Sequence, residues 1–260
     1  MRLEAGNDIL FTGGRAEAQG TALLTAERDL IVDAQAASLD VTGKGAHFSR
    51  LGWAGSEISA NDVGLQAGRD LIVAASHVKA ENDAALEAGG NVSLEARTGE
   101  THASMTYKTG SGGFGSKGSA EKRYDSTGAV GSSLTAGGDV SLKAGLDSGL
   151  GKGSVTMQAG RITAGGDATL SATGDITLAA GENTSYSYVN TQSRNMISAK
   201  SYLKETASLT HTGSEISGTN VTLHAGDNVL ISGSKVAASN DLGLKADTGD
   251  VVVASVADMY

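Results

Sequence analysis

Short alternations of apolar and polar residues, each preceded by a glycine-containing turn, recur along the whole chain. The clearest copies are Ala88-Gly-Gly-Asn-Val-Ser-Leu-Glu-Ala96, Ala136-Gly-Gly-Asp-Val-Ser-Leu-Lys-Ala144, Ala164-Gly-Gly-Asp-Ala-Thr-Leu-Ser-Ala172 and Thr173-Gly-Asp-Ile-Thr-Leu-Ala-Ala180. Gly, Asn and Asp accept the backbone angles of tight turns, and Val-x-Leu-x-Ala alternates with the period of two that is typical of a strand. Each unit is therefore predicted to be a turn followed by a short β-strand with one apolar face.

The turn residues repeat with a period of 21. Pairs of Asp or Asn at this separation are Asp8 and Asp29, Asp62 and Asp83, Asp70 and Asn91, and Asn220 and Asp241. A period of this length, filled by short strands and turns, indicates a coil of a parallel β-helix. Leucine-rich repeats have a similar length, but their Leu-x-x-Leu-x-Leu spacing does not occur in these units. The predicted fold is all-β, a parallel β-helix that occupies residues 1–260 as a single segment.

A larger duplication supports stacked coils, because Gly55-Ser-Glu-Ile-Ser59 returns as Gly213-Ser-Glu-Ile-Ser217. Stacking would place equivalent turn residues about 4.8 Å apart, where two carboxylates repel each other. Three of the four pairs in the duplicated blocks combine Asn with Asp, and only Asp62 with Asp83 does not. These three are Asp70 with Asn91, Asn220 with Asp241, and Asn228 with Asp250. We therefore expect amide-to-carboxylate hydrogen bonds between successive coils.

The pattern is interrupted twice, at residues 97–133 and 183–212. Both interruptions contain alternating stretches, Thr101-His-Ala-Ser-Met-Thr-Tyr-Lys108 in the first and Ser185-Tyr-Ser-Tyr-Val189 in the second. They are predicted to be two protruding β-hairpins, the first with a Gly/Ser-rich tip at residues 110–118. The tip of the second has a composition that also allows a short helix from Met196 to Glu205.

Positive charge and aromatic residues concentrate in these two hairpins. The first has five Lys or Arg against three acids, and the second has three against one. Exposed Tyr beside Lys or Arg is typical of binding surfaces and membrane interfaces, because the ring buries area at low entropic cost while the hydroxyl remains hydrated. The alternative is that the rings pack the hairpins against the coil. The candidate surface contacts are Tyr107, Phe114, Lys117, Arg123, Tyr124, Tyr186, Tyr188, Arg194, Tyr202 and Lys204.

Composition excludes several classes of protein. The 260 residues include 37 Gly but no Pro and no Cys, so that disulfides, thiolate metal sites and cysteine nucleophiles are excluded. Aromatic residues make up 4% of the chain, which predicts a core of aliphatic side chains. The net charge of −9 is opposite to the basic footprint of a nucleic-acid-binding module, and neither DNA nor RNA is an expected partner.

No sequence motif for a cofactor or a metal is supported by the residues around it. Gly110, Gly112 and Gly115 match the dinucleotide pattern, but no helix follows them to bind the phosphates, and no nucleotide is expected. The five histidines, His47, His77, His102, His211 and His224, lack the spacing of metal ligands. Trp53 is predicted to pack over a corner of a coil. Parallel β-helices also include polysaccharide lyases and hydrolases that use clustered acids, but here the recurring Asp residues occupy turn positions.

The repeated phrases resemble the haemagglutinin repeats of filamentous-haemagglutinin-like exoproteins, which include the toxins of contact-dependent growth inhibition. The resemblance rests on Gly213-Ser-Glu-Ile-Ser-Gly-Thr-Asn-Val-Thr-Leu-His-Ala-Gly-Asp-Asn-Val-Leu-Ile-Ser232 and on the Ala-Gly-Gly-Asp-Val-Ser-Leu-Lys-Ala copies. It implies a right-handed parallel β-helix that is exported through an outer-membrane two-partner secretion transporter and displayed on Gram-negative cells. It also implies an internal segment of a larger protein, without catalytic residues.

The expected function is that of a non-enzymatic stalk. In the inhibition toxins, repeats of this kind engage the outer membrane of the target cell during toxin delivery, and the resemblance implies the same role for this chain. Two alternatives remain open: an adhesin module that binds host or bacterial glycans, and a β-helix polysaccharide lyase or hydrolase.

Overall fold

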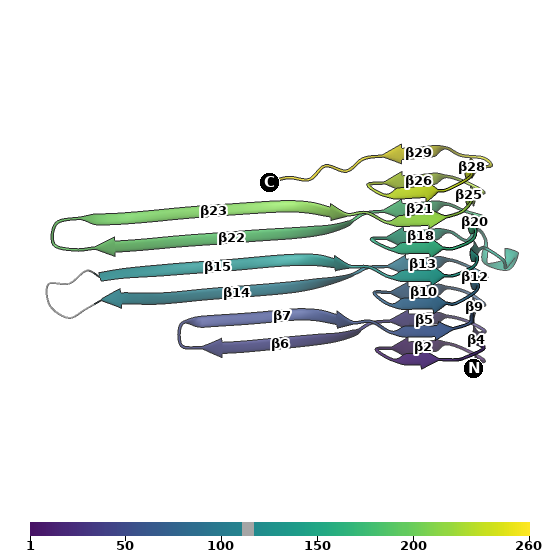
Figure 1. Cartoon of the computed structure of the whole chain (residues 1–260), viewed down its shortest axis with the longest axis horizontal. Helices are drawn as coiled ribbons and strands as arrows, with labels where there is room; N and C mark the ends of the chain where they lie inside the picture. The colour runs from purple at the N-terminus through teal and green to yellow at the C-terminus, as the bar shows by residue number, and fades with distance from the viewer. Residues whose placement is uncertain (111–116) are drawn as a thin grey trace.

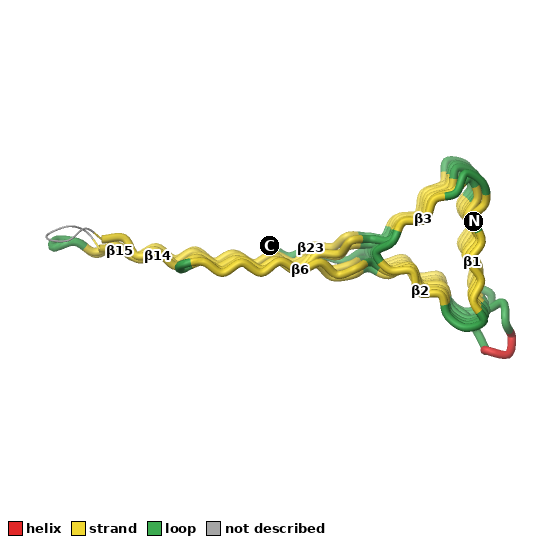
Figure 2. Tube along the Cα trace, turned by 90° about the horizontal axis from the view of Figure 1, so that it is seen from below, coloured by secondary structure: helices red, strands yellow, loops and turns green. Residues whose placement is uncertain are grey.

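Three parallel sheets wind together into a β-helix of triangular cross-section, from one corner of which a fourth sheet projects (Figures 1 and 2). The computed structural model describes residues 1–110 and 117–260. Each complete turn of the helix, called a coil below, contributes one strand to sheet A, then one to sheet B and then one to sheet C. The coils are numbered one to eight after the eight strands of sheet A, in chain order. The parallel β-helix predicted from the sequence is thereby confirmed.

Sheet A consists of β1 (Arg2–Ala5), β4 (Thr21–Ala26), β9 (Asp62–Ala67), β12 (Ala84–Ala88), β17 (Val140–Ala144), β20 (Ala168–Ala172), β25 (Val221–Ala225) and β28 (Leu242–Ala246). Sheet B consists of β2 (Ile9–Thr12), β5 (Leu30–Asp33), β10 (Leu71–Ala74), β13 (Val92–Glu95), β18 (Val155–Gln158), β21 (Ile176–Ala179), β26 (Val229–Ser232) and β29 (Val251–Ala254). Sheet C consists of β3 (Arg15–Glu17), β8 (Glu57–Ala60), β11 (His77–Ala80), β16 (Ser133–Ala136), β19 (Arg161–Ala164), β24 (Glu215–Gly218) and β27 (Lys235–Ala238).

The interior is built from columns of like side chains. One leucine of sheet A stacks on its equivalent in every coil, in the order Leu3, Leu24, Leu65, Leu86, Leu142, Leu170, Leu223 and Leu244. Aliphatic columns of sheets B and C complete the core, and Val140, Leu142, Ile176 and Leu178 are all buried in it. A single coil buries too few side chains to stand alone, so that each coil depends on its neighbours.

A ladder of turn side chains joins all eight coils at the corner between sheets A and B. At each step a side-chain oxygen accepts a hydrogen bond from the backbone N–H of the equivalent residue in the next coil, through Asp8, Asp29, Asp70, Asn91, Ser154, Asp175, Asn228 and Asp250. Of the three mixed pairs, Asp70 with Asn91 forms the expected amide-to-carboxylate hydrogen bond, at 3.0 Å. The amides of Asn220 and Asn228 donate instead to Asp167 and Asp175 of the preceding coil, so that the expected carboxylate partners of these two amides were wrong. The recurrence of Asp and Asn at these turns therefore has a structural cause.

The projecting sheet D consists of three hairpins, one more than the sequence predicted. They are hairpin 1, β6 (Gln35–Gly43) with β7 (Ala46–Ala54); hairpin 2, β14 (Arg97–Gly110) with β15 (Lys117–Val130); and hairpin 3, β22 (Gly181–Arg194) with β23 (Ala199–Thr212). Trp53, expected over a coil corner, lies in β7. Hairpin 3 ends in a turn followed by strand, so that the short helix considered from Met196 to Glu205 is wrong. Most of the glycine-rich tip of hairpin 2 lies outside the described residues.

Hairpin 1 escaped the sequence analysis because of its length. The stacked residues Leu24 and Leu65 are 41 positions apart, close to twice the period of 21, so that the hairpin resembles one additional coil. A shorter departure occurs in coil five, where a loop with the 3₁₀ turn η1 (Ser148–Leu150) projects at a different corner from the hairpins (Figure 2).

Truncation of the leucine column is expected to cost most in the middle of the helix. Leu142→Ala should lower the free energy of unfolding by about 2–5 kcal/mol, because the coils on both sides prevent the cavity from closing. Leu244→Ala, in the partly exposed last coil, should cost clearly less. Urea denaturation followed by circular dichroism measures both values, and equal losses would contradict a core that is tightest at its centre.

Strong acid should weaken the first coil. Hydrogen bonds from Arg28 and from the backbone of Asp29 lower the pKa of Asp8 from 3.8 to about 2. Because the folded-state pKa is depressed, this contribution to stability is complete above pH 3.8 and is lost as the pH falls through about 2. Hydrogen exchange of coil-one amides across this range should show the loss. Arg28→Gln should weaken coil one already at neutral pH and remove most of the dependence; an unchanged profile would contradict the assignment.

Candidate functional site

Sheet D can exist because hairpins leave the helix only on alternate coils. Each hairpin runs from sheet B to sheet C, in coils two, four and six (Figure 1). Strands of a sheet lie about 4.8 Å apart, so that the two arms of a hairpin need the same height, about 9.6 Å, as two coils of the helix. Neighbouring hairpins therefore meet, and β7 pairs with β14 as β15 pairs with β22. The result is one continuous antiparallel sheet of six strands.

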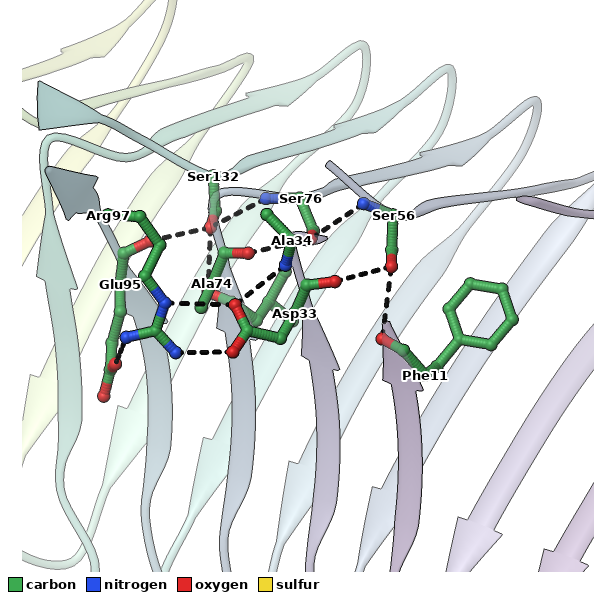
Figure 3. Close-up of polar contacts among 10 residues, drawn as sticks. Phe11, Asp33, Ala34, Ser56, Ala74, Ser76, Glu95, Arg97 and Ser132 are labelled. Carbon is green, nitrogen blue, oxygen red and sulfur yellow. Dashed lines mark hydrogen bonds and ion pairs between the residues drawn. The ribbon is translucent and has the colours of Figure 1, made fainter. Parts of the chain in front are cut away.

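A buried serine closes the coil at the root of each hairpin. The hydroxyl of Ser56 donates to the carbonyl of Asp33, where the chain leaves sheet B, at 2.7 Å (Figure 3). The carbonyl oxygen of Phe11, in the coil below, lies 3.1 Å from the same hydroxyl and shares its proton. Ser132 and Ser214 contact the equivalent carbonyls at hairpins 2 and 3. These serines are almost fully buried, so that their hydroxyls satisfy carbonyls that water cannot reach.

In the coils that have no hairpin, the chain turns this corner with a single residue of positive φ. The residues are Gly13, Ala75, Ala159 and Gly233, with φ between 44° and 59°. A residue in this conformation reverses the chain at once, but it costs about 1–2 kcal/mol when it is not glycine. The helix thus alternates two solutions at one corner, a left-handed residue and a hairpin.

An ion pair connects the roots of hairpins 1 and 2 across the coil between them. Arg97, the first residue of β14, donates two hydrogen bonds to Asp33, of 3.0 Å from Nε and 2.7 Å from a terminal nitrogen (Figure 3). The Asp33 carboxylate raises the pKa of Arg97, and Glu95 lies 3.5 Å from the same guanidinium. Both partners are about three-quarters buried, and the two hydrogen bonds join the root of hairpin 2 to Asp33 at the root of hairpin 1.

The two faces of sheet D differ in charge. Side chains of successive residues alternate between the faces of a strand, and the unbroken register of sheet D places whole rows on the same face. All six carboxylates of the described hairpin strands fall on one face, which we name the acidic face. They are Asp40, Glu100, Glu121, Asp125, Glu182 and Glu205. The opposite face has no carboxylate among the described strands.

Hydrogen bonds and ion pairs within the acidic face engage four of its six carboxylates. His47 contacts Asp40 at 3.1 Å, and His102 forms an ion pair with Asp125 when it is protonated. Tyr186 donates a hydrogen bond of 2.8 Å to Glu205, which raises the pKa of this tyrosine. Arg123 pairs with Glu121 and lies over the ring of Tyr188, 5.9 Å from its centre. In the middle of this face, opposite charges are therefore paired with each other.

The opposite face, named the basic-aromatic face, carries four cations in the middle and outer parts of the hairpins and most of the exposed apolar side chains of sheet D. The cations are Arg50, Lys122, Lys200 and Lys204, and the apolar residues are Leu39, Val41, Phe48, Met105, Tyr107, Tyr124, Val189 and Tyr202. A shallow groove of about 590 Å³ lies among Val41, Phe48, Ala103, Met105, Tyr124 and Val189. No ion pair to any of the four cations occurs within residues 1–110 and 117–260.

The predicted contact residues divide between these faces. Tyr107, Tyr124, Tyr202 and Lys204 lie on the basic-aromatic face, whereas Lys117, Arg123, Tyr186, Tyr188 and Arg194 lie on the acidic one. Phe114 is outside the described residues. Sequence reasoning missed Val41, Phe48 and Arg50 because it missed hairpin 1, although the alternation Leu39-Asp-Val41 and His47-Phe-Ser-Arg50 was a usable signal.

The last residues of the chain lie along β23, which is one of the two edge strands of sheet D. Beyond coil eight the chain lies against β23, with reciprocal backbone hydrogen bonds of 2.8 Å between Leu209 and Met259. Asp258 accepts hydrogen bonds from the backbone and the ring of His211, at 2.9 and 3.0 Å. Coil eight thus continues the alternation, since the chain leaves it at the corner where the hairpins leave coils two, four and six.

No arrangement for metal chemistry occurs in the described part of the chain. Within residues 1–110 and 117–260, no three His, Asp or Glu side chains converge in a way that would hold a metal ion. The helical segments described there are all too short to cross a membrane.

A family model for the hemagglutinin repeat matches residues 35–111, 112–203 and 196–260. The chain belongs to the hemagglutinin repeat family. No match was found among the curated proteins or the solved structures that were compared. The second match begins between β14 and β15 and ends within β23, so that it covers the arms β15 and β22, the first residues of β23 and the coils between the two hairpins.

Loss of a root hydroxyl should destabilise the hairpin it closes. Ser132→Ala leaves the carbonyls of Val73 and Glu95 without this donor, and should lower the free energy of unfolding by about 1–3 kcal/mol. Ser141→Ala, a half-exposed position in β17, should change it by less than about 0.5 kcal/mol. Hydrogen exchange should localise the effect of Ser132→Ala to hairpin 2 and coil four; equal effects of both substitutions would contradict the proposed role.

Proposed function

We propose that this chain is a non-enzymatic stalk segment of a secreted exoprotein of the two-partner secretion type, which contacts the target-cell surface during delivery of a contact-dependent growth inhibition toxin. Hemagglutinin repeats are typical of secreted or cell-surface proteins. The β-helix supplies length, because each added coil extends the same columns and ladders. In the whole protein, an outer-membrane transporter exports the stalk and the target-cell surface or a receptor is its partner.

The observation that carries the contact function is the projection of sheet D. It leaves the helix as a single layer, and the outer parts of both faces lie away from the coils (Figure 2). Exposed apolar residues such as Phe48, Met105, Tyr107 and Tyr124 have no packing role in the core of the helix. A sheet that exposes such residues is a platform for binding.

The ladder argues for a stalk and against a polysaccharide-cleaving groove. Recurring acids of the coils hold the next coil by accepting a backbone N–H: Asp29, Asp70 and Asp175 do so in the ladder, and Asp139 and Asp167 do so at the corner between sheets C and A. Carboxylates with this structural role account for the abundance of Asp without a hydrolytic mechanism.

Shortening hairpins 2 and 3 tests the contact function. Residues 104–123 and 188–205 are each replaced by Asn-Gly. The new turns join Ala103 to Tyr124 and Ser187 to Thr206, and the two residues of each pair already lie opposite each other in the sheet. Binding of the fluorescent chain to Gram-negative cells should fall by at least about tenfold, equivalent to 1.4 kcal/mol.

The control removes a projection from another corner. Residues 146–152 are replaced by Gly-Gly, which deletes the loop with η1 and leaves sheet D intact. This variant should bind cells like the original chain. Undiminished binding by the shortened hairpins would overturn the contact function, whereas binding of the intact chain to arrayed glycans alone would favour an adhesin.

A further inference from the structure

The charges of sheet D are segregated in a way that its own stability does not require. An exposed sheet is stabilised by opposite charges on neighbouring strands, and the acidic face has such pairs in His47 with Asp40 and in His102, when protonated, with Asp125. The basic-aromatic face has Arg50, Lys122, Lys200 and Lys204 but no carboxylate on the described strands. Its cations therefore lack partners within the described chain, and an anion from outside would complement them.

Apolar side chains lie between these cations. Val41, Phe48, Met105 and Tyr124 are 36% to 53% exposed and border the groove of about 590 Å³. Lys122 lies in the row of Met105, so that a charged group is adjacent to an apolar surface. On the acidic face, by contrast, Leu203 is the one large apolar residue of the described hairpin strands with comparable exposure.

We propose that the basic-aromatic face of sheet D binds an anionic lipid surface, with Arg50, Lys122, Lys200 and Lys204 at the headgroup phosphates and the apolar side chains below them. The inference rests on the proposed contact function and names the chemistry of the partner. Aromatic rings and the aliphatic stems of lysine and arginine fit the boundary between headgroups and acyl chains, where rings are half hydrated and charged tips reach the phosphates.

A lipid surface fits the observations better than a soluble polyanion does. A polyanion needs only positive charge, and the outer part of the acidic face already supplies Lys108, Lys117 and Arg194. The large exposed aliphatic residues of this outer part, Met196 and Ile197, lie in the turn of hairpin 3 and not on the strands of the face. What distinguishes the basic-aromatic face is the mixture of cations with exposed Phe, Tyr, Met and Val. Sheet D is also broad enough to lie on a membrane, with strands of 14 residues, or about 48 Å at full extension.

The test compares charge removal on the two faces of the intact chain. The first variant, Lys122→Gln with Lys204→Gln, removes two charges from the basic-aromatic face; the matched control, Lys108→Gln with Arg194→Gln, removes two from the acidic face. Flotation with vesicles of phosphatidylglycerol in phosphatidylcholine measures binding. The first variant should lose at least about tenfold in the partition coefficient, because each cation near an anionic surface is worth roughly a factor of five. The control should lose less than about threefold.

A second variant separates the apolar contribution from charge. Phe48→Ser with Met105→Ser leaves the net charge unchanged and should still weaken vesicle binding, whereas it should not alter binding to dextran sulfate, a soluble polyanion. Hydrogen exchange of sheet D confirms that the hairpins remain folded in each variant.

Several outcomes overturn the inference. These are equal losses in the two charge variants, equal binding to neutral and anionic vesicles, or binding to dextran sulfate without binding to vesicles. None of them affects the contact function, which depends on cell binding by the shortened hairpins. Conversely, if hairpin shortening leaves cell binding intact while vesicle binding follows the basic-aromatic face, the lipid surface is a genuine ligand but not the cellular contact.

Discussion

The distance between hydrogen-bonded strands, about 4.8 Å, governs both parts of this molecule. It sets the rise of each coil, because every strand of sheets A, B and C pairs with its equivalent one turn away. It also sets the height of a hairpin, which needs two such spacings. A hairpin on every coil would be too crowded to pair, and one on every third coil would leave an edge exposed between neighbours. Alternate coils are the arrangement in which helix and sheet D are both fully paired.

The β-helix could be predicted from the sequence because the same structural requirement returns at equivalent positions of successive coils. Every coil needs a residue that accepts a hydrogen bond at the position of Asn91 in the ladder, and an apolar residue at the position of Leu142 in the column. Both residue types therefore recur along the sequence. Hairpin 1 was hidden because its residues 35–54 match the length of a coil and alternate as strands do. The segregation of charge on sheet D was hidden for a different reason, since it depends on which strands become neighbours and in which register.

The two halves of the molecule use side chains for different purposes. In the coils, polar residues are occupied by the fold itself: Ser56, Ser132 and Ser214 complete the backbone hydrogen bonds at the hairpin roots, and the Asp and Asn ladder joins successive turns. On sheet D the acidic face is likewise engaged internally. The basic-aromatic face has no carboxylate on the described strands and combines its cations with most of the exposed Phe, Tyr, Met and Val side chains of these strands, which is why the proposed contacts are placed there.

The alternation of a left-handed residue and a hairpin at one corner constrains how such arrays change in length. Loss or gain of a single coil by recombination would bring two hairpins to adjacent levels, or separate them by a gap, and sheet D would be interrupted. Exchange of two coils together preserves both the interior columns and the pairing of arms, as the span of the hemagglutinin repeat from one hairpin to the next reflects. Filaments built from these units should therefore differ in length by whole multiples of about 9.6 Å.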